Sequence, residues 1–141
     1  MKLNSGSLAK LKGVHPDLVR VVMRCAADWK DAETGFIVTC GVRTLAEQKV
    51  LKAKGASRTL RSRHIPAANG YAHAVDLAYL INGKVRWDFP LYDKLAKCMK
   101  AAAKAERVPL EAGIDWVSFR DGPHFQLPWK EYPGTKTGVK K

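Results

Sequence analysis

The chain has 141 residues, of which 46% are hydrophobic and 27% charged, a composition that argues against disorder over most of its length and leaves room for one domain with one core. Its 25 Lys and Arg residues outnumber the 13 Asp and Glu residues, so the formal net charge is +12. This excess predicts attraction to an anionic polymer or surface, and nucleic acid, anionic lipid and an acidic cell wall all fit it.

Three cysteines, Cys25, Cys40 and Cys98, form no Cys-x-x-Cys pair and lie among apolar neighbours. We interpret them as small buried hydrophobic residues in a protein made in a reducing compartment. The first seven residues lack the apolar segment of a secretory signal, and no apolar run is long enough to cross a bilayer. If the protein acts outside the cytoplasm, another component has to release it.

The N-terminal part of the chain predicts two helices and a strand. Residues 7–12 form a short helix, and the sequence His15-Pro16-Asp17 begins a second helix that continues to about residue 30. We interpret His15 as a loop or capping residue, since no carboxylate or thiol lies at ligand spacing nearby. The β-branched run over residues 36–40 predicts a central strand.

Thr44 and Glu47 have the spacing of a capping box, which predicts a helix that begins here and stops at Gly55. Arg43 directly precedes it, where a strand gives way to a helix, and this is a common position for a site residue. A solvated arginine near a loop explains Arg43 equally well.

The next segment, residues 56–71, is basic and contains Arg58, Arg61 and Arg63. We interpret it as a loop that faces solvent or an anion. A strand over residues 73–80 follows, and Asn82-Gly83 predicts a tight hairpin turn that returns through residues 84–87.

The C-terminal part predicts a long helix capped by Asp88, then a short strand and turn over residues 110–116 and a buried strand over residues 124–127. The buried stripe of the helix is expected to be Leu91, Leu95, Cys98, Met99 and Ala102. Its lysines form a solvated face. We expect one domain over residues 1–133 and a basic, flexible tail over residues 134–141.

Histidine and aspartate residues supply candidate metal ligands. In a strand through Asp76, alternate side chains point to opposite faces, so His73 points away from Asp76 unless a bulge intervenes. His64, in the preceding loop, has no such restriction, and His124 comes from far along the chain. Two imidazoles and one carboxylate can hold zinc and leave a fourth position for water. A partly exposed histidine in a basic loop is the alternative for His64.

Asp121 lies three residues before His124, across Gly122-Pro123. A carboxylate beside a zinc-activated water can accept its proton and later pass it to the leaving amine. Because Asp-Gly-Pro is also strong turn chemistry, a purely structural turn residue is the alternative.

Several of these residues belong to short motifs that occur in the order seen in the VanY/VanX-like zinc D-alanyl-D-alanine peptidases. The motifs are Gly41-Val42-Arg43-Thr44, Ser62-x-His64, Ala74-Val75-Asp76-Leu77, Asp115-Trp116 and Asp121-x-x-His124-Phe125. The chain most resembles the phage endolysins of that family that act as L-alanyl-D-glutamate endopeptidases, over residues 7–127. The resemblance implies an α+β fold, in which helices pack on a small, mainly antiparallel sheet (hedgehog/D-Ala-D-Ala-peptidase-like).

The resemblance also implies roles for individual residues. His64, Asp76 and His124 match the zinc ligands, Asp121 the catalytic acidic residue, Arg43 the arginine that stabilises the oxyanion or orients the substrate, and Ser62 a position near the substrate. The implied protein is a zinc enzyme that cuts peptidoglycan stem peptides. A monomer is the simplest expectation for its oligomeric state. The enzyme would be made in the host cytoplasm and released by a holin-like partner, and its charge suits carboxylate-rich peptides and an anionic envelope surface.

One feature departs from the common pattern of that family. Twelve positions separate His64 from Asp76, and Ala72 stands where the pattern has Gly. We interpret residues 66–71 as a loop insertion that affects specificity more than metal binding.

Three other hypotheses compete. A D-Ala-D-Ala or L,D-carboxypeptidase would share the fold. A nucleic-acid-binding domain would explain the charge, but it predicts a reader motif or an aromatic platform, and we find neither. A wall-recognition module that binds metal without catalysis would leave Asp121 without a role.

Overall fold

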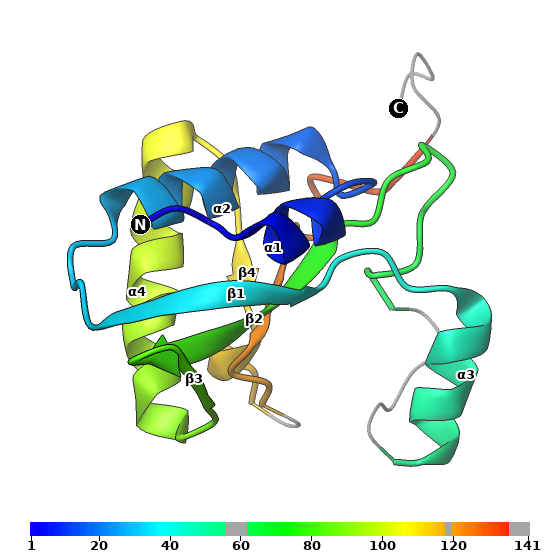
Figure 1. Cartoon of the computed structure of the whole chain (residues 1–141). Coiled ribbons are helices and arrows are strands. Elements are labelled where there is room, and N and C mark those ends of the chain that lie inside the picture. Colours follow the sequence, from blue (N-terminus) through cyan, green and yellow to red (C-terminus); the bar gives the residue numbers. More distant parts are fainter. Residues whose placement is uncertain (56–61, 118–119, 136–141) are drawn as a thin grey trace.

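The computed structural model describes residues 1–55, 62–117 and 120–135, and Figure 1 shows their arrangement. These residues form an α+β fold with four α-helices and a five-stranded antiparallel sheet. The strands are β1 (Thr34–Cys40), β2 (Ala74–Ile81), β3 (Lys84–Arg86), β4 (Glu111–Ala112) and β5 (His124–Gln126). The helices are α1 (Ser5–Lys10), α2 (Pro16–Asp28), α3 (Leu45–Ala53) and α4 (Phe89–Glu106).

Strand β2 is the centre of the sheet. One of its sides pairs with β1 from Asp76 to Ile81, and the other is shared between β5 near the start and β3 near the end. The strand order is β1-β2-β5-β4, so β1 lies at an edge and its prediction as a central strand was wrong. Its β-branched, apolar residues reflect burial of its inner face and not pairing on both sides.

The pairing registers place three site-forming residues in one row across the sheet. Asp76 of β2 lies opposite Cys40 of β1 and opposite His124 of β5. The β1 register shifts between Val38 and Cys40, which makes Thr39 the extra residue of a bulge. Because directly paired residues project from the same face, Cys40, Asp76 and His124 share a face.

Helix α2 packs against α4, α4 packs against β2, and residues of all three elements belong to one hydrophobic core. Val75, Leu77 and Tyr79 supply the strand's side of this core, as alternation through Asp76 predicts. On α4 the prediction was partly wrong, since Tyr92 is buried while Leu91 and Cys98 are only partly so. The Tyr92 hydroxyl donates to the Arg86 carbonyl at 2.7 Å and accepts from the Tyr79 amide at 3.0 Å, which satisfies its polar group inside the core.

Three local predictions are confirmed. Thr44 and Glu47 form the capping box of α3, and His15 caps α2 by accepting from the Asp17 amide at 3.0 Å. Asn82 and Gly83 have φ angles of +50° and +79°, the left-handed conformation that a two-residue hairpin requires.

In Figure 1, α3 stands away from the other three helices, beyond the end of β1.

Arg63 was predicted to lie in a solvated loop, and this was wrong. Its side chain is buried, with 3% exposed, and its guanidinium donates to the carbonyl groups of Leu127 and Tyr132 and lies 4.0 Å from the Trp129 ring centre. These two backbone carbonyl groups therefore bind the guanidinium in place of an external anion. Arg58 and Arg61 lie outside the described residues.

Residues 66–71 form a turn that closes on itself. The Ala67 amide donates to the Tyr71 carbonyl at 3.0 Å, and the Gly70 amide donates to the Ala67 carbonyl at 2.9 Å. The turn packs against the C-terminal segment, where the buried Gly134 accepts from the Asn69 amide at 3.0 Å. The division of the chain after residue 133 stays a prediction, and residues 136–141 lie outside the described part.

None of the described helices is both long and apolar enough to span a bilayer.

Candidate metal centre

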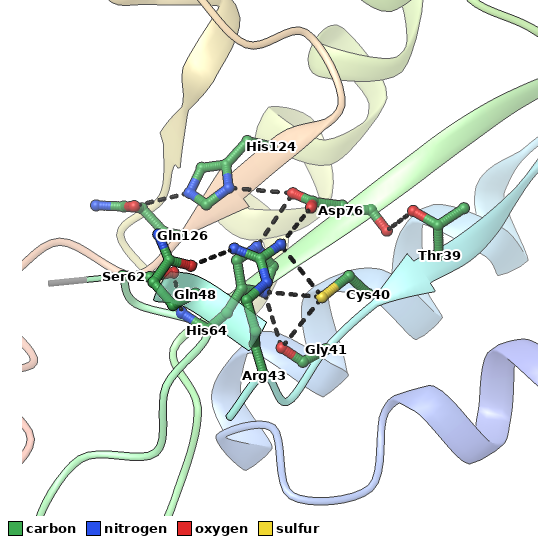
Figure 2. Close-up of polar contacts among 10 residues, drawn as sticks. All are labelled: Thr39, Cys40, Gly41, Arg43, Gln48, Ser62, His64, Asp76, His124 and Gln126. Carbon is green, nitrogen blue, oxygen red and sulfur yellow. Dashed lines mark hydrogen bonds and ion pairs between the residues drawn. The ribbon is translucent and has the colours of Figure 1, made fainter. Parts of the chain in front are cut away.

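The carboxylate of Asp76 is the meeting point of two imidazole rings (Figure 2). Its Oδ1 atom lies 3.2 Å from His64 Nε2 and 3.1 Å from His124 Nδ1. The two rings stand edge to face with their centres 5.2 Å apart. The structure thus brings together His64, Asp76 and His124, which are separated by up to 60 positions in sequence.

The position of His64 is fixed by the loop after β1. His64 Nδ1 contacts the Gly41 carbonyl oxygen at 2.8 Å, and the Arg43 amide donates to the His64 carbonyl at 2.9 Å. Gly41 has to be glycine, because a Cβ there would lie 2.0 Å from the Lys10 carbonyl oxygen. His64 is 1% exposed, so the alternative of a partly exposed loop histidine is wrong.

His124 is oriented by a chain of two further side chains. Glu111 accepts from the Gln126 side-chain nitrogen at 2.9 Å, which leaves the Gln126 amide oxygen facing His124 Nε2 at 2.8 Å. His124 Nε2 therefore carries the hydrogen, and its Nδ1 presents a lone pair toward Asp76. The same logic applies to His64, whose Nδ1 donates to the Gly41 carbonyl and whose Nε2 faces Asp76.

The acceptor atoms of these three side chains are arranged as a cation site requires. With both rings neutral, two nitrogen lone pairs and a carboxylate oxygen converge, and the three acceptors repel one another unless a proton or a metal cation lies among them. Each ring also donates its other N–H to an oxygen, the usual outer arrangement around metal-binding histidines. Two imidazoles and one carboxylate form a donor set suited to a divalent transition metal.

The titration behaviour of the metal-free protein reflects the same geometry. Burial pushes the pKa of Asp76 up, but hydrogen bonds with His124 and His64 outweigh burial and hold that pKa well below its usual range. Burial lowers the pKa of His64, whereas its hydrogen bonds with Asp76 and Cys40 raise it to about 10. Without metal, a proton on His64 therefore supplies the missing positive charge.

Asp121 lies beside the three convergent residues. Ligand atoms of Asp76, Asp121 and His124 are all within 4.8 Å of one another. The Asp121 backbone packs on Gly113, where a Cβ would lie 2.3 Å from the Asp121 carbonyl oxygen. Burial, and then the negative charge of Asp76, raise the pKa of the Asp121 carboxyl. Asp121 also has the turn role, because its carbonyl accepts from the His124 amide at 3.2 Å.

Arg43 is partly buried and points at the centre, so the alternative of a solvated arginine is wrong. Its Nη2 lies 3.4 Å from Asp76 Oδ2, and its Nη1 donates to Gln48 Oε1 at 2.8 Å. The Ser62 hydroxyl accepts from the His64 amide at 3.1 Å, which shapes the turn that presents His64.

Cys40 is a member of the site that the sequence interpretation missed. It is partly exposed, and its Sγ lies 3.6 Å from His64 Nδ1 and 3.5 Å from Arg43 Nη2. Cys40, His64 and Asp76 form a second candidate metal-binding group. Cys40 lies on the Nδ1 side of His64, however, and that nitrogen is already bonded to Gly41. The position of Cys40 directly before Gly41-Val42-Arg43 was the available signal.

The two other histidines lie elsewhere. His73 is buried directly before β2, where its Nε2 contacts the side-chain nitrogen Nδ2 of Asn69 at 3.1 Å, and His15 caps α2. Within the described part of the chain, neither joins a candidate metal-binding group.

Comparison with known proteins identifies the class to which this centre belongs. The family model described as phage L-alanyl-D-glutamate peptidase matches residues 1–127. The chain belongs to this family, which confirms the predicted family and the predicted class of enzyme, a peptidase.

Individual relatives agree with this family assignment. The chain is 31% identical to the L-alanyl-D-glutamate peptidase of Listeria phage A118 over 94% of its own length, but it spans only 44% of that protein. It is 29% identical to the L-alanyl-D-glutamate peptidase of Escherichia phage T5, with 85% of both chains covered. The crystal structure of the Serratia marcescens L-Ala D-Glu endopeptidase ChiX is similar, with a TM-score of 0.82, 36% identity and 94% of both chains covered, which confirms the predicted α+β fold.

Proposed function

We propose that the chain is a zinc-dependent endopeptidase that hydrolyses the L-alanyl-D-glutamate bond of peptidoglycan stem peptides. The observation that carries this proposal is the convergence of His64 Nε2, Asp76 Oδ1 and His124 Nδ1, with the Asp121 carboxylate beside them. Family membership supports the substrate class, since the matched relatives carry the name of this activity.

His64, Asp76 and His124 would hold the zinc ion. When bound, zinc would supply a Lewis acid that polarises the scissile carbonyl group. We favour this set over the one with Cys40, because Cys40 lies beside the nitrogen of His64 that donates to Gly41.

Asp121 acts as general base and then as general acid. Its carboxylate takes a proton from the attacking water and later gives a proton to the amine that leaves. Its partly buried position beside Asp76 favours proton uptake, since a second carboxylate disfavours the charged form.

Arg43 stabilises the charge that develops on the carbonyl oxygen. Gln48 holds one end of the guanidinium, and the planar group keeps several N–H donors in a fixed orientation toward the centre. Ser62 is assigned a position near the substrate, on the turn that presents His64.

The net charge of +12 suits a substrate rich in carboxylates and an anionic envelope surface. We propose that the protein acts as a monomer on the host cell wall during phage-driven lysis. It would be made in the host cytoplasm and reach the wall after release by a holin-like partner.

The test combines metal analysis with wall degradation. Purified protein should contain about one zinc ion per chain, as one set of three ligands implies, and should lower the turbidity of a peptidoglycan suspension. Chelation should abolish this activity and zinc should restore it. No zinc and no wall hydrolysis would overturn the proposal and favour the basic, nucleic-acid-binding alternative.

The bond that is cut is read from the products by mass spectrometry of digested muropeptides. An L-alanyl-D-glutamate endopeptidase leaves L-alanine on the glycan and releases the rest of the stem. Loss of only the terminal residue would show a carboxypeptidase of the same fold instead.

A further inference from the structure

Two cysteines outside the metal centre lie unusually close together. Cys25 of α2 and Cys98 of α4 have their sulfur atoms 2.8 Å apart, well inside the ordinary contact distance of two non-bonded sulfur atoms. Cys98 Sγ also lies 3.5 Å from the Cys25 carbonyl oxygen. The two residues are 73 positions apart in sequence, so the packing of α2 on α4 creates this contact.

The environments of the two thiols differ. Cys25 is completely buried, whereas Cys98 is partly exposed and lines an open surface pocket with Trp29, Lys94 and Lys97. Asp28 and Asp31 also line this pocket. The hydrogen bond from Cys25 lowers the pKa of Cys98, and the same bond, together with burial, raises the pKa of Cys25. Cys98 is thus the accessible nucleophile and Cys25 the buried partner that can resolve a mixed disulfide.

We propose that Cys25 and Cys98 form an intramolecular disulfide when the folded protein meets an external disulfide such as glutathione disulfide. The Cys98 thiolate attacks one sulfur of that reagent, forms a mixed disulfide and expels one thiolate. Cys25 then loses its proton and attacks the Cys98 sulfur, which expels the second thiolate. The two protein thiols are oxidised, and one external disulfide is reduced to two thiols.

This exchange matches a change of compartment. Cytoplasmic thiol systems keep such a pair reduced, whereas an oxidising compartment outside the cytoplasm favours the disulfide. The new bond would tie α2 to α4 across the main core. The candidate metal ligands lie on other elements, so the oxidation of this pair rests on helix packing, and only the change of compartment rests on the proposed function.

The first experiment counts thiols in the full-length, zinc-loaded protein. After incubation with glutathione disulfide and acid quenching, titration of the unfolded protein should show one thiol in place of the three in the sequence. Intact mass should fall by two hydrogens, and peptide mapping should find residues 25 and 98 in one cross-linked species. The melting temperature should rise by about 5 °C or more, because the bond closes a long loop, and a reducing agent should reverse the rise.

Variants separate this pair from Cys40. Cys40→Ser should keep the response, with its thiol count falling from two to zero, whereas Cys25→Ser and Cys98→Ser should lose both the cross-link and the thermal shift. Persistence of all three thiols in the wild-type protein would overturn the inference. A stable glutathione adduct on Cys98, with Cys25 still reduced, would overturn it as well.

Discussion

Arg43 donates a hydrogen bond from Nη1 to the side-chain oxygen of Gln48 across 2.8 Å, and this contact joins the loop after β1 to helix α3. Gln48 is the one residue of α3 that is buried. Its amide fixes the plane of the guanidinium, whose Nη2 then faces Asp76 Oδ2. Gln48 is therefore a positioning residue for the proposed oxyanion donor.

Arg43→Lys should lower kcat/KM on a soluble muropeptide by about 100-fold, the cost of removing one oxyanion donor. A lysine ammonium cannot face Gln48 and the metal centre at once. Zinc content should remain that of the wild type. Arg20→Lys is the control, since Arg20 lies on the surface of α2 in ion pairs with Asp17 and Glu106. Equal kcat/KM values for Arg43→Lys and the wild type would remove Arg43 from the mechanism.

Asp121→Asn should reduce kcat by about 100-fold to 10,000-fold, the range for loss of a general acid–base group. The amide keeps the size of the side chain and its turn, so zinc binding and the melting temperature should change little. Asp115→Asn provides a matched control, because Asp115 is exposed and paired with Lys100 at 2.6 Å. Undiminished wall degradation by Asp121→Asn would contradict the assigned role.

Gln126→Leu should weaken zinc binding by about 10-fold to 100-fold, measured by competition with a chelator of known affinity. The substitution removes the acceptor that orients His124 through Nε2. Glu111→Gln retains an acceptor oxygen for the Gln126 amide and should bind zinc much more like the wild type. If both variants bound zinc as tightly as the wild type, the hydrogen bonds that link Glu111, Gln126 and His124 would have no part in metal binding.

The metal-free protein should lose stability as the pH rises from about 6.5 to about 10. His64 has a folded-state pKa of about 10 against an ordinary value of 6.5. Its protonated form therefore favours folding at pH values below 6.5, and this contribution disappears as the pH passes the folded-state pKa. Urea denaturation midpoints of the chelated protein across this range measure the effect.

Two comparisons isolate His64 as the source of that pH dependence. Zinc-saturated protein should show a weaker loss, because the metal replaces the proton among the three acceptors. A chelated His64→Gln variant should lack this part of the pH dependence. A midpoint that is constant for chelated wild-type protein between these pH values would contradict the assignment.

Arg63→Met should lower the free energy of unfolding by about 1–3 kcal/mol, because the carbonyl groups of Leu127 and Tyr132 lose a buried donor. Chemical denaturation measures this change directly. Arg86→Met is the control, since Arg86 pairs with Asp88 on the surface, and such pairs contribute less than about 1 kcal/mol. A solvated Arg63 would give the two variants similar stabilities.

Local sequence signals predicted the local structure well. Thr44 and Glu47 define a helix start through their own side chains, and Asn82-Gly83 defines a hairpin through its backbone preferences. The ordered motifs also predicted the family, and through it the α+β fold. The structure brings the three candidate ligands together, although their assignment to zinc stays a proposal.

The features that were missed depend on contacts between distant segments. Gln48 and Gln126 carry no sequence signal of their own, because the role of Gln48 follows from where α3 lies and that of Gln126 from the pairing of β5 with β4. Arg63 stands in a basic run, and its burial becomes evident only when the segment around Leu127 covers it. The edge position of β1 is likewise a property of the strand order and not of its residues.

Insertions and deletions should have opposite consequences in the turn over residues 66–71 and in the paired strands. The turn over residues 66–71 closes through its own backbone, so homologues can gain or lose residues there without moving His64 or Asp76. A single-residue deletion within the paired segments 74–76 or 124–126 instead turns a candidate ligand toward the opposite face of the sheet. Surviving insertions and deletions should therefore cluster in the turn, and a one-residue change in the ladder should inactivate the protein even where it still folds.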